Sequence, residues 1–296
     1  MDNLTHGITG LGLAYVAQEI IAVPQAGLAV CAIISSQLPD LDVLIGSRGK
    51  TAYLKHHRGF SHSLFLAPLL AGFTAWGVKL FFPQTDYGLL FLISFLSLGL
   101  HLFLDLLNAY GTKLLWPFSQ HRFALDILMI IDPLIIMIFV LGISLYVFKD
   151  QRTLLFALYP LLVLYILAMR NLRHKAKTCL MKNFPENRRI SLLPPLLGWR
   201  NWNFILEESQ VYYLGQIDAF AGQIMIKEKL SKKEECLHVR ATKNDPEVQV
   251  FLEFARHPWF SKDERDKELV VKWSDLRYKL REREHFTIES KPILKP

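Results

Sequence analysis

Long apolar runs fill the first 170 residues of the chain, and most approach the length that a membrane-spanning helix needs, about 20 mostly apolar residues. The predicted helical segments are Leu4–Gln18, Ile20–Leu38, Ser63–Phe82, Tyr87–Leu107, Ile127–Phe148 and Thr153–Met169. The first segment is rich in glycine and carries His6, so it either crosses the membrane or lies at its surface. The pattern predicts an α-helical polytopic membrane bundle of five or six helices.

Beyond Trp202 the apolar residues recur in short runs with a period near two, which is typical of strands with one buried face. These runs are Asn203–Glu208, Val211–Asp218, Gln223–Glu228, Val248–Phe254, Leu269–Ser274 and His285–Glu289. We therefore predict a membrane domain over residues 1–170 and a small cytoplasmic antiparallel β domain over residues 201–296. The basic, proline-bearing residues 171–200 are expected to form a linker that rests on anionic lipid headgroups.

The charge distribution supports this division of the chain. The 296 residues carry a net charge of +7 and have a mean hydropathy of +0.23. Residues 1–170 hold 10 Lys and Arg against 9 Asp and Glu, and the remaining residues hold 24 against 18. This division excludes a single soluble globule and a disordered chain. The excess positive charge would suit nucleic acid, but no basic and aromatic motif accompanies it. Attraction to a membrane surface explains it, and no nucleic-acid partner is expected.

Lys and Arg in the connections orient the bundle, because basic loops stay on the cytoplasmic side. The connections at residues 39–61 and 108–126 are basic, and so is the segment after the last helix. Of the alternate connections, two carry no basic residue and the third carries Lys149 and Arg152. With six spanning helices, the strongly basic connections share one side. We therefore expect a multi-pass protein with both termini in the cytoplasm.

Most histidines and acids of the membrane domain stand at the helix ends on this predicted cytoplasmic side. Along the chain they are Asp2, His6, Asp40, Asp42, His56, His57, His62, His101, Asp105, His121, Asp126 and Asp132. His101 and Asp105 are spaced i, i+4 inside an apolar run, where side chains facing lipid would cost several kcal/mol. Both are therefore expected to point into the bundle and to find polar partners there.

Imidazoles and carboxylates that converge from several helix ends are what a divalent metal site requires. The candidate ligands are His6, Asp40, Asp42, His57, His62, His101 and Asp105, and of the neighbours His56 and His57 only one is expected to bind. Zinc is favoured, with manganese or magnesium as alternatives, and roughly one to three ions are expected. Five further residues, each with a structural alternative as a cap or loop residue, are Asp2, His56, His121, Asp126 and Asp132.

Four residues of the same region are candidates for catalytic roles. Asp42 or Asp105 would accept a proton during hydrolysis. Arg58 and Arg122 would hold an anionic substrate such as a phosphate or a carboxylate by bidentate contacts.

Five motifs follow one another in a fixed order: Asp-x-x-x-His from Asp2, Pro-Asp-Leu-Asp from Pro39, His-Arg-Gly-x-Ser-His-Ser from His57, His-x-x-x-Asp-x-x-Asn-x-x-Gly from His101, and Asp-Pro at Asp132. In this order they resemble the YdjM/YbcI family, a bacterial group of inner-membrane proteins described as metal-dependent hydrolases. That family is distantly similar to zinc-dependent phospholipase C and the S1/P1-type nucleases. The resemblance covers roughly residues 1–170 and implies hydrolysis of a phosphoester at the inner membrane, with a phospholipid as one candidate substrate.

Two other functions use the same residues. A transporter or proton relay would carry ions along the acids and histidines, but it needs polar residues at mid-membrane depth on several helices. A non-catalytic membrane scaffold would hold a structural metal in a closed tetrahedral shell, and its β domain would recruit a partner. In the hydrolase, the β domain would cover or gate the site.

Overall fold

The structure is a computed structural model that describes residues 1–22, 26–185, 189–195, 198–232, 234–265, 268–279 and 287–292. The chain forms two compact units, residues 1–45 with 56–171 and residues 46–55 with 172–296. The first unit is helical, and the second contains all the strands of the described residues.

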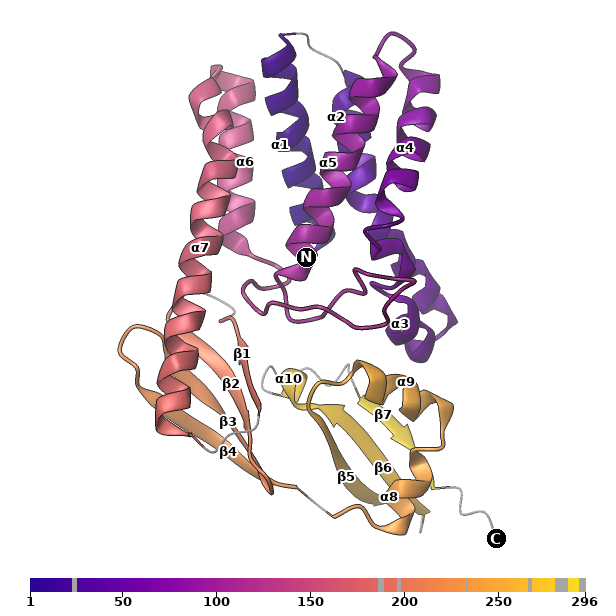
Figure 1. Cartoon of the computed structure of the whole chain (residues 1–296), viewed down its shortest axis with the longest axis vertical. Coiled ribbons are helices and arrows are strands. Elements are labelled where there is room, and N and C mark those ends of the chain that lie inside the picture. The colour runs from indigo at the N-terminus through magenta and orange to yellow at the C-terminus, as the bar shows by residue number, and fades with distance from the viewer. Residues whose placement is uncertain are drawn as a thin grey trace. The chain divides into compact units, whose positions relative to one another are not determined.

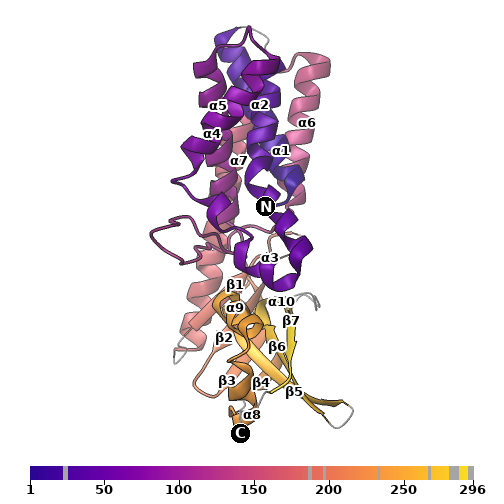
Figure 2. The same ribbon diagram turned by 90° about the vertical axis from the view of Figure 1, so that its right-hand side faces the viewer.

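In the described part of the first unit, helices lie side by side as a bundle (Figures 1 and 2). They are α1 (Asn3–Ile21), α2 (Ala26–Gln37), α4 (Ala67–Phe81), α5 (Tyr87–Leu106), α6 (Pro133–Lys149) and the first part of α7 (Arg152–Asn183). Successive helices run in opposite directions, so the starts of α1, α4 and α6 and the ends of α2 and α5 share one end of the bundle (Figure 1). Seven histidines and acids gather at this end, namely His6, Asp40, Asp42, His57, His62, His101 and Asp105.

Three segments of the described chain are long and apolar enough to cross a membrane: Ala26–Ser47, α5 and α7. Residues 50–62 together with α4 pass the same test as a pair, but the pair is bent by 79°. Helix α6 is apolar and shorter. The membrane-type helical domain is thus confirmed, whereas five or six spanning helices stays a prediction.

Two of the predicted helices begin later than expected. The helix predicted from Ile127 begins at Pro133, because Asp132 accepts hydrogen bonds from the backbone N–H groups of Leu134 and Ile135 and so caps it. Proline fits the first turn of a helix, where no N–H is needed. The helix predicted from Ser63 begins at Ala67, after a short irregular stretch.

The segments between the helices place the polar residues. A 3₁₀ segment, η1 (Leu38–Arg48), follows α2 and carries Asp40 and Asp42, which were expected to close the α-helix itself. The short helix α3 (Lys50–His56) and the 3₁₀ turn η2 (Phe60–His62) come next. Residues 107–132 form a largely irregular connection between α5 and α6.

Small residues let helices of the bundle approach closely, as is common in membrane proteins. A Cβ atom on Gly10 of α1 would lie 2.9 Å from Ser36 Cβ and 3.0 Å from the Ala32 carbonyl oxygen of α2. The hydroxyls of Ser35 on α2 and Ser94 on α5 hydrogen-bond over 2.6 Å. Contacts of this kind fix the end of α2 relative to α1 and α5.

The described strands of the second unit form two antiparallel sheets with the orders β1-β2-β3-β4 and β5-β6-β7. They are β1 (Arg189–Leu193), β2 (Asn201–Glu207), β3 (Val211–Asp218), β4 (Ile224–Ser231), β5 (Pro258–Arg265), β6 (Glu268–Asp275) and β7 (Thr287–Ser290). The predicted antiparallel β domain is thus confirmed, and β2, β3, β4 and β6 coincide with predicted runs. Part of the run His285–Glu289 lies outside the described residues, and its end falls in β7.

The strand predicted over Val248–Phe254 is wrong, because this segment is the helix α9 (Pro246–Phe254). Its apolar residues alternate in the sequence, but the buried ones are Val248, Phe251 and Phe254, which are spaced as one face of a helix. Asp245 caps the helix, and proline again stands in its first turn.

Other elements of the second unit were not predicted. The basic stretch 171–200, expected to be a linker, contains the end of α7 and the strand β1. The strand β5 and the short helices α8 (Leu237–Thr242) and α10 (Leu276–Lys279) were also missed.

A buried histidine connects β1 and β2 to the start of β5 in the second unit. His257 is 0% exposed, and its Nε2 lies 2.7 Å from the Ser191 hydroxyl. Its Nδ1 lies 3.6 Å from a carboxylate oxygen of Glu207. Burial lowers the pKa of His257 below its ordinary value, although Glu207 acts in the opposite direction.

This burial predicts a pH dependence of stability. The unfolded chain protonates His257 near its ordinary pKa of about 6.5, and the folded chain only at a lower pH, so protons stabilise the unfolded state as the pH falls below that value. We expect the Tm of the full chain in detergent to fall between neutral and acidic pH, and to fall less steeply in the His257→Gln variant. His238→Gln, at an exposed position, should keep the wild-type slope. Equal slopes for wild type and His257→Gln would contradict this prediction.

The close packing of α1 on α2 gives a second prediction. We expect Gly10→Val to lower the free energy of unfolding by about 1–3 kcal/mol, because the added side chain must push the two helices apart. The measurement is thermal unfolding in detergent. Gly99→Val on α5 is the matched control, because a Cβ there meets no atom within 4 Å. If the two variants unfold at the same temperature, the close approach at Gly10 is not present.

Candidate metal centre

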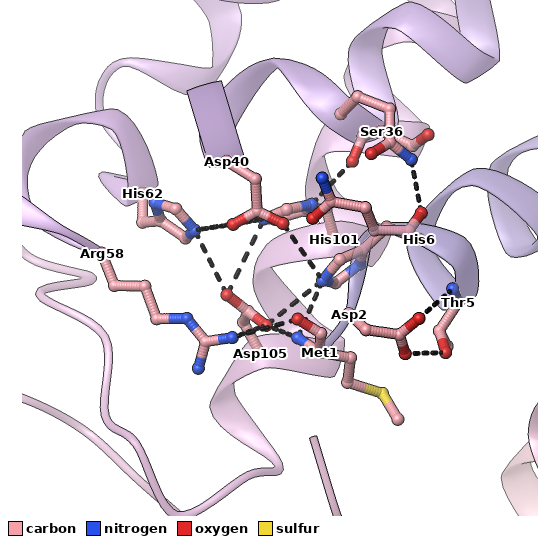
Figure 3. Close-up of polar contacts among 12 residues, drawn as sticks. Met1, Asp2, Thr5, His6, Ser36, Asp40, Arg58, His62, His101 and Asp105 are labelled. Carbon is pink, nitrogen blue, oxygen red and sulfur yellow. Dashed lines mark hydrogen bonds and ion pairs between the residues drawn. The ribbon is translucent and has the colours of Figure 1, made fainter. Parts of the chain in front are cut away.

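Four buried side chains meet at the end of the bundle where α2 and α5 end (Figure 3). Asp40 comes from η1, His62 from η2, and His101 and Asp105 from the last turns of α5. Each residue is at most 5% exposed. One ligand atom from each lies within 4.8 Å of the others, so the four could hold a metal ion.

The distances between the facing atoms match those of a compact ligand set. The Nε2 atoms of His62 and His101 are 3.2 Å apart. Asp40 Oδ1 lies 3.3 and 3.9 Å from these two atoms, and Asp105 Oδ2 lies 3.2 and 3.8 Å from them. Two ligand atoms that each stand about 2.0–2.1 Å from a tetrahedral zinc ion are separated by about 3.3 Å. The four atoms thus have nearly the spacing of a tetrahedral donor set.

The outer nitrogen of each imidazole donates a hydrogen bond. His101 Nδ1 lies 2.7 Å from the Ser36 carbonyl oxygen, which can only accept. His62 Nδ1 lies 3.0 Å from the Ser61 hydroxyl, whose own proton is donated to Asp42 over 2.6 Å. Both Nδ1 atoms therefore carry the proton in a neutral imidazole, and both Nε2 atoms present a lone pair.

Two lone pairs and two carboxylate oxygens thus face one another in a buried space, and they repel unless a cation stands among them. Within the described chain, Asp105 Oδ2 receives no hydrogen bond. The outer hydrogen bonds of His62 and His101 are the kind that orient metal-ligating histidines. The residues present therefore fit a divalent metal ion.

His6 lies beside this group rather than within it. Its ring stacks on that of His101 with centroids 3.7 Å apart. Its Nε2 lies 3.2 Å from Asp105 Oδ1 and 4.0 Å from Asp40 Oδ2. The Met1 ammonium contacts Asp105 Oδ1 and lies 2.8 Å from the same nitrogen (Figure 3). The structure therefore places His6, predicted from the sequence to be a ligand, at the edge of the cluster and outside the two groups that could hold a metal ion in the described chain.

Asp42 and His57 form a second layer behind His62. Asp42 Oδ1 accepts a hydrogen bond from His57 Nδ1 over 2.6 Å, and its Oδ2 accepts one from the Arg58 backbone N–H over 2.8 Å and one from Ser61. Together with Asp40, they form another group whose ligand atoms lie within 4.8 Å. Because donors already surround both oxygens of Asp42, its contacts favour orienting the two histidines over binding an ion.

Arg58 and Arg122 make hydrogen bonds and ion pairs with protein groups around the cluster. Arg58 is 3% exposed, and its guanidinium lies 2.9 Å from Asp105 Oδ1 and donates to Asn108 Oδ1 over 2.8 Å. Arg122 donates to the backbone carbonyls of His57 and Gly111 over 3.1 and 3.3 Å. These contacts favour a positioning role for both residues over the holding of substrate expected from the sequence.

The five less secure residues lie outside the two groups that could hold a metal ion in the described chain. Asp2 caps α1 through the N–H groups of Leu4 and Thr5, and Asp132 caps α6 and accepts a hydrogen bond from Tyr165. His56 and His121 are exposed, and Asp126 is buried with a positive φ of 54°. Helix capping accounts for the aspartates at positions 2 and 132 without any ligand role.

Three supporting groups were not among the site residues predicted from the sequence, although Ser61 and Asn108 stand in its motifs. The Ser36 carbonyl accepts a hydrogen bond from His101. The Ser61 hydroxyl contacts both Asp42 and His62. The Asn108 amide oxygen accepts a hydrogen bond from Arg58. Ser61 could have been found, because it stands beside His62 in a dense polar motif. A backbone carbonyl leaves no signal in the sequence.

The fold and the cluster define a helical membrane protein with a buried candidate metal centre. Residues 1–175 match the YdjM inner membrane protein family, so the chain belongs to that family, as its motifs predicted. Residues 238–289 match the YfhP C-terminal alpha/beta plait domain. The chain is 26% identical over 289 residues to the uncharacterized protein YfhP of Bacillus subtilis (strain 168). The aligned residues cover 94% of this chain and 87% of that protein. No solved structure matches the chain.

The contacts of Asp42 generate a prediction about metal affinity. Asp42→Asn replaces one acceptor oxygen by a donor that faces other donors, so His62 loses its orientation. We expect zinc to bind about 10–100-fold more weakly, as measured by competition with a chromophoric chelator on the detergent-purified protein. Asp86→Asn is the control, because Asp86 caps α5 through Leu89 and asparagine also caps well. Unchanged affinity in Asp42→Asn, with normal thermal unfolding, would show that Asp42 does not orient the ligands.

Proposed function

We propose that this protein is a membrane-bound metal-dependent hydrolase and that the cluster of Asp40, His62, His101 and Asp105 is its metal site. The observation that carries the proposal is the 3.2 Å approach of two imidazole nitrogens whose lone pairs face each other between two carboxylates. Such a group is unfavourable when buried without a cation. Membership of an inner-membrane family and the apolar helices support the membrane location.

The donor set favours zinc. Two imidazoles and two carboxylates suit zinc, with manganese as an alternative, whereas magnesium prefers oxygen ligands and retains water. A divalent ion held there would supply Lewis-acid stabilisation of the negative charge that develops on a phosphoester during hydrolysis. The substrate we propose is a phosphoester, lipid-type substrates included, on the basis of the family resemblance to phosphodiester-cleaving enzymes.

The chain's own residues would position and exchange protons around this ion. Arg58 and Asn108 hold Asp105, which keeps its free oxygen directed at the facing imidazoles. Asp42 fixes His57 Nδ1, and His57 is 8% exposed, more than His6, His62 or His101. We therefore assign proton exchange with solvent to the Asp42 and His57 pair.

The distribution of basic residues supports one side of the membrane for the site. The basic connections at residues 39–61 and 108–126 flank the cluster in sequence, and basic connections stay in the cytoplasm. We accordingly place the site at the cytoplasmic interface of the membrane, with both termini on the same side.

The test is hydrolysis of a chromogenic phosphodiester and of a fluorescent phospholipid by the detergent-purified protein. Chelation should abolish activity and zinc should restore it. Asp105→Asn should lose stoichiometric metal and lower the rate by at least about 100-fold, while Asp86→Asn should behave as wild type. If the wild-type protein binds no stoichiometric metal, or if Asp105→Asn keeps full activity, the proposal is wrong.

A further inference from the structure

Residues 58–65, which carry His62, also present apolar side chains on the protein surface; we call this segment the wall. Within residues 58–65, Arg58, Ser61, His62 and Ser63 are buried, and His62 faces the cluster. In the same segment Phe60, Leu64 and Phe65 are 43%, 48% and 55% exposed. A single short segment thus presents the candidate metal site on one side and large apolar groups on the other.

The loop after α5 extends this apolar surface. Its residues are tied to the wall by backbone hydrogen bonds from Leu64 N–H to the Leu114 carbonyl and from Lys113 N–H to the Arg58 carbonyl, both 3.0 Å long. Phe118 of the loop is 78% exposed, and its ring lies 4.8 Å from that of Phe65. The rings of Trp116 and Phe60 are 6.2 Å apart. We call this surface the aromatic rim, and its residues are Phe60, Leu64, Phe65, Trp116 and Phe118.

The rim continues the exposed apolar face of α4. That face carries Leu69, Phe73, Trp76 and Leu80, each more than half exposed and spaced as one stripe of the helix. Exposed apolar patches of this extent mark an interaction surface, and on a membrane helix the partner is lipid. Phe65 stands two residues before Ala67, the first residue of α4, so we expect the lipid that contacts this face of α4 to contact the rim as well.

Most backbone N–H groups of the loop are hydrogen-bonded within the protein. Five of the seven N–H groups of residues 112–119 donate to protein carbonyls, those of Thr112, Lys113, Leu114, Trp116 and Ser119, and Pro117 has no N–H. Irregular backbone is tolerated at membrane depth only when its polar groups are satisfied inside the protein. Lys113 and Arg122 belong to the same connection as Trp116 and Phe118, and aromatic residues beside basic ones are typical of the headgroup boundary.

We propose that the aromatic rim is embedded in the lipid bilayer at the headgroup boundary, so that residues 112–118 contact lipid and not bulk water. The wall bearing His62 is then shared between the candidate metal site and the membrane. The proposal goes beyond the hydrolase function and does not depend on it, because depth in the bilayer requires neither metal nor substrate.

The test is the depth of a nitroxide spin label in the full chain, reconstituted in phosphatidylcholine and phosphatidylglycerol vesicles. The label is attached to Phe118→Cys after Cys31, Cys179 and Cys236 are replaced by serine. We expect its collisions with oxygen to exceed those with a water-soluble nickel chelate, as for a label at Leu96→Cys on the exposed face of α5. A label at Leu237→Cys, 75% exposed in the second unit, provides the aqueous reference.

A label at position 118 that collides with the nickel chelate as freely as the Leu237→Cys label would overturn the proposal. Should Phe118→Cys fail to fold, Phe65→Cys gives the same comparison. Quenching of Trp116 fluorescence by brominated lipid, obtained as the difference between wild type and Trp116→Phe, gives it without a label. Absence of any such quenching would likewise overturn the proposal.

Discussion

The close approach of two histidine nitrogens is the constraint on which the rest of the site depends. His62 and His101 are far apart in the sequence, yet their Nε2 atoms stand 3.2 Å apart, with carboxylate oxygens of Asp40 and Asp105 beside them. Their outer nitrogens are already committed to Ser61 and the Ser36 carbonyl. Only a positive charge between them makes the arrangement favourable. Asp40, Asp42 and Asp105 carry three negative charges, whereas Arg58 and the Met1 ammonium supply two positive ones, so one negative charge is left to balance.

Local departures from regular structure follow from this constraint. After Gln37 the chain tightens from an α-helix into the 3₁₀ segment η1, which carries Asp40 and Asp42 into the bundle end. Arg58 adopts a positive φ of 55°, uncommon for a residue with a side chain, and its N–H thereby reaches Asp42. Gly59 follows because a Cβ there would lie 2.6 Å from the His56 carbonyl oxygen. Such strain is concentrated at sites whose geometry the surrounding structure holds in place.

How much could be predicted depended on whether a residue's role is set by local spacing or by distant contacts. His101 and Asp105 share a face of an apolar helix, so their inward direction follows from helical periodicity alone. An aspartate at a helix end, such as Asp132, can be either a metal ligand or a helix cap, and the residue type alone does not separate these roles. In the structure Asp132 caps α6, whose first residue is a proline. In the second unit, the alternation over Val248–Phe254 resembled a strand, whereas packing buries every third residue of a helix. The partners of Asp42 and His101 could not be predicted, because they are distant in the sequence and only the fold brings them close. The Ser61 hydroxyl donates to Asp42, and the Ser36 carbonyl accepts from His101.

The distribution of polar groups along the bundle separates a fixed site from a path for ions. Within the described helices of the first unit, no acid or histidine lies between His6 and Glu19 on α1, and none occurs in α2, in α4, or in α5 before His101. From His6 to Glu19 the helix rises about 20 Å, and the buried polar contacts along this length are made by hydroxyls such as Ser35 with Ser94 and Tyr159 with the Thr9 carbonyl. A proton or ion relay needs titratable groups at intermediate depth. These helices carry their acids and histidines only near their ends, with the cluster at one end and Glu19 at the opposite end of α1. This distribution favours a stationary candidate metal centre over a pathway through the bundle.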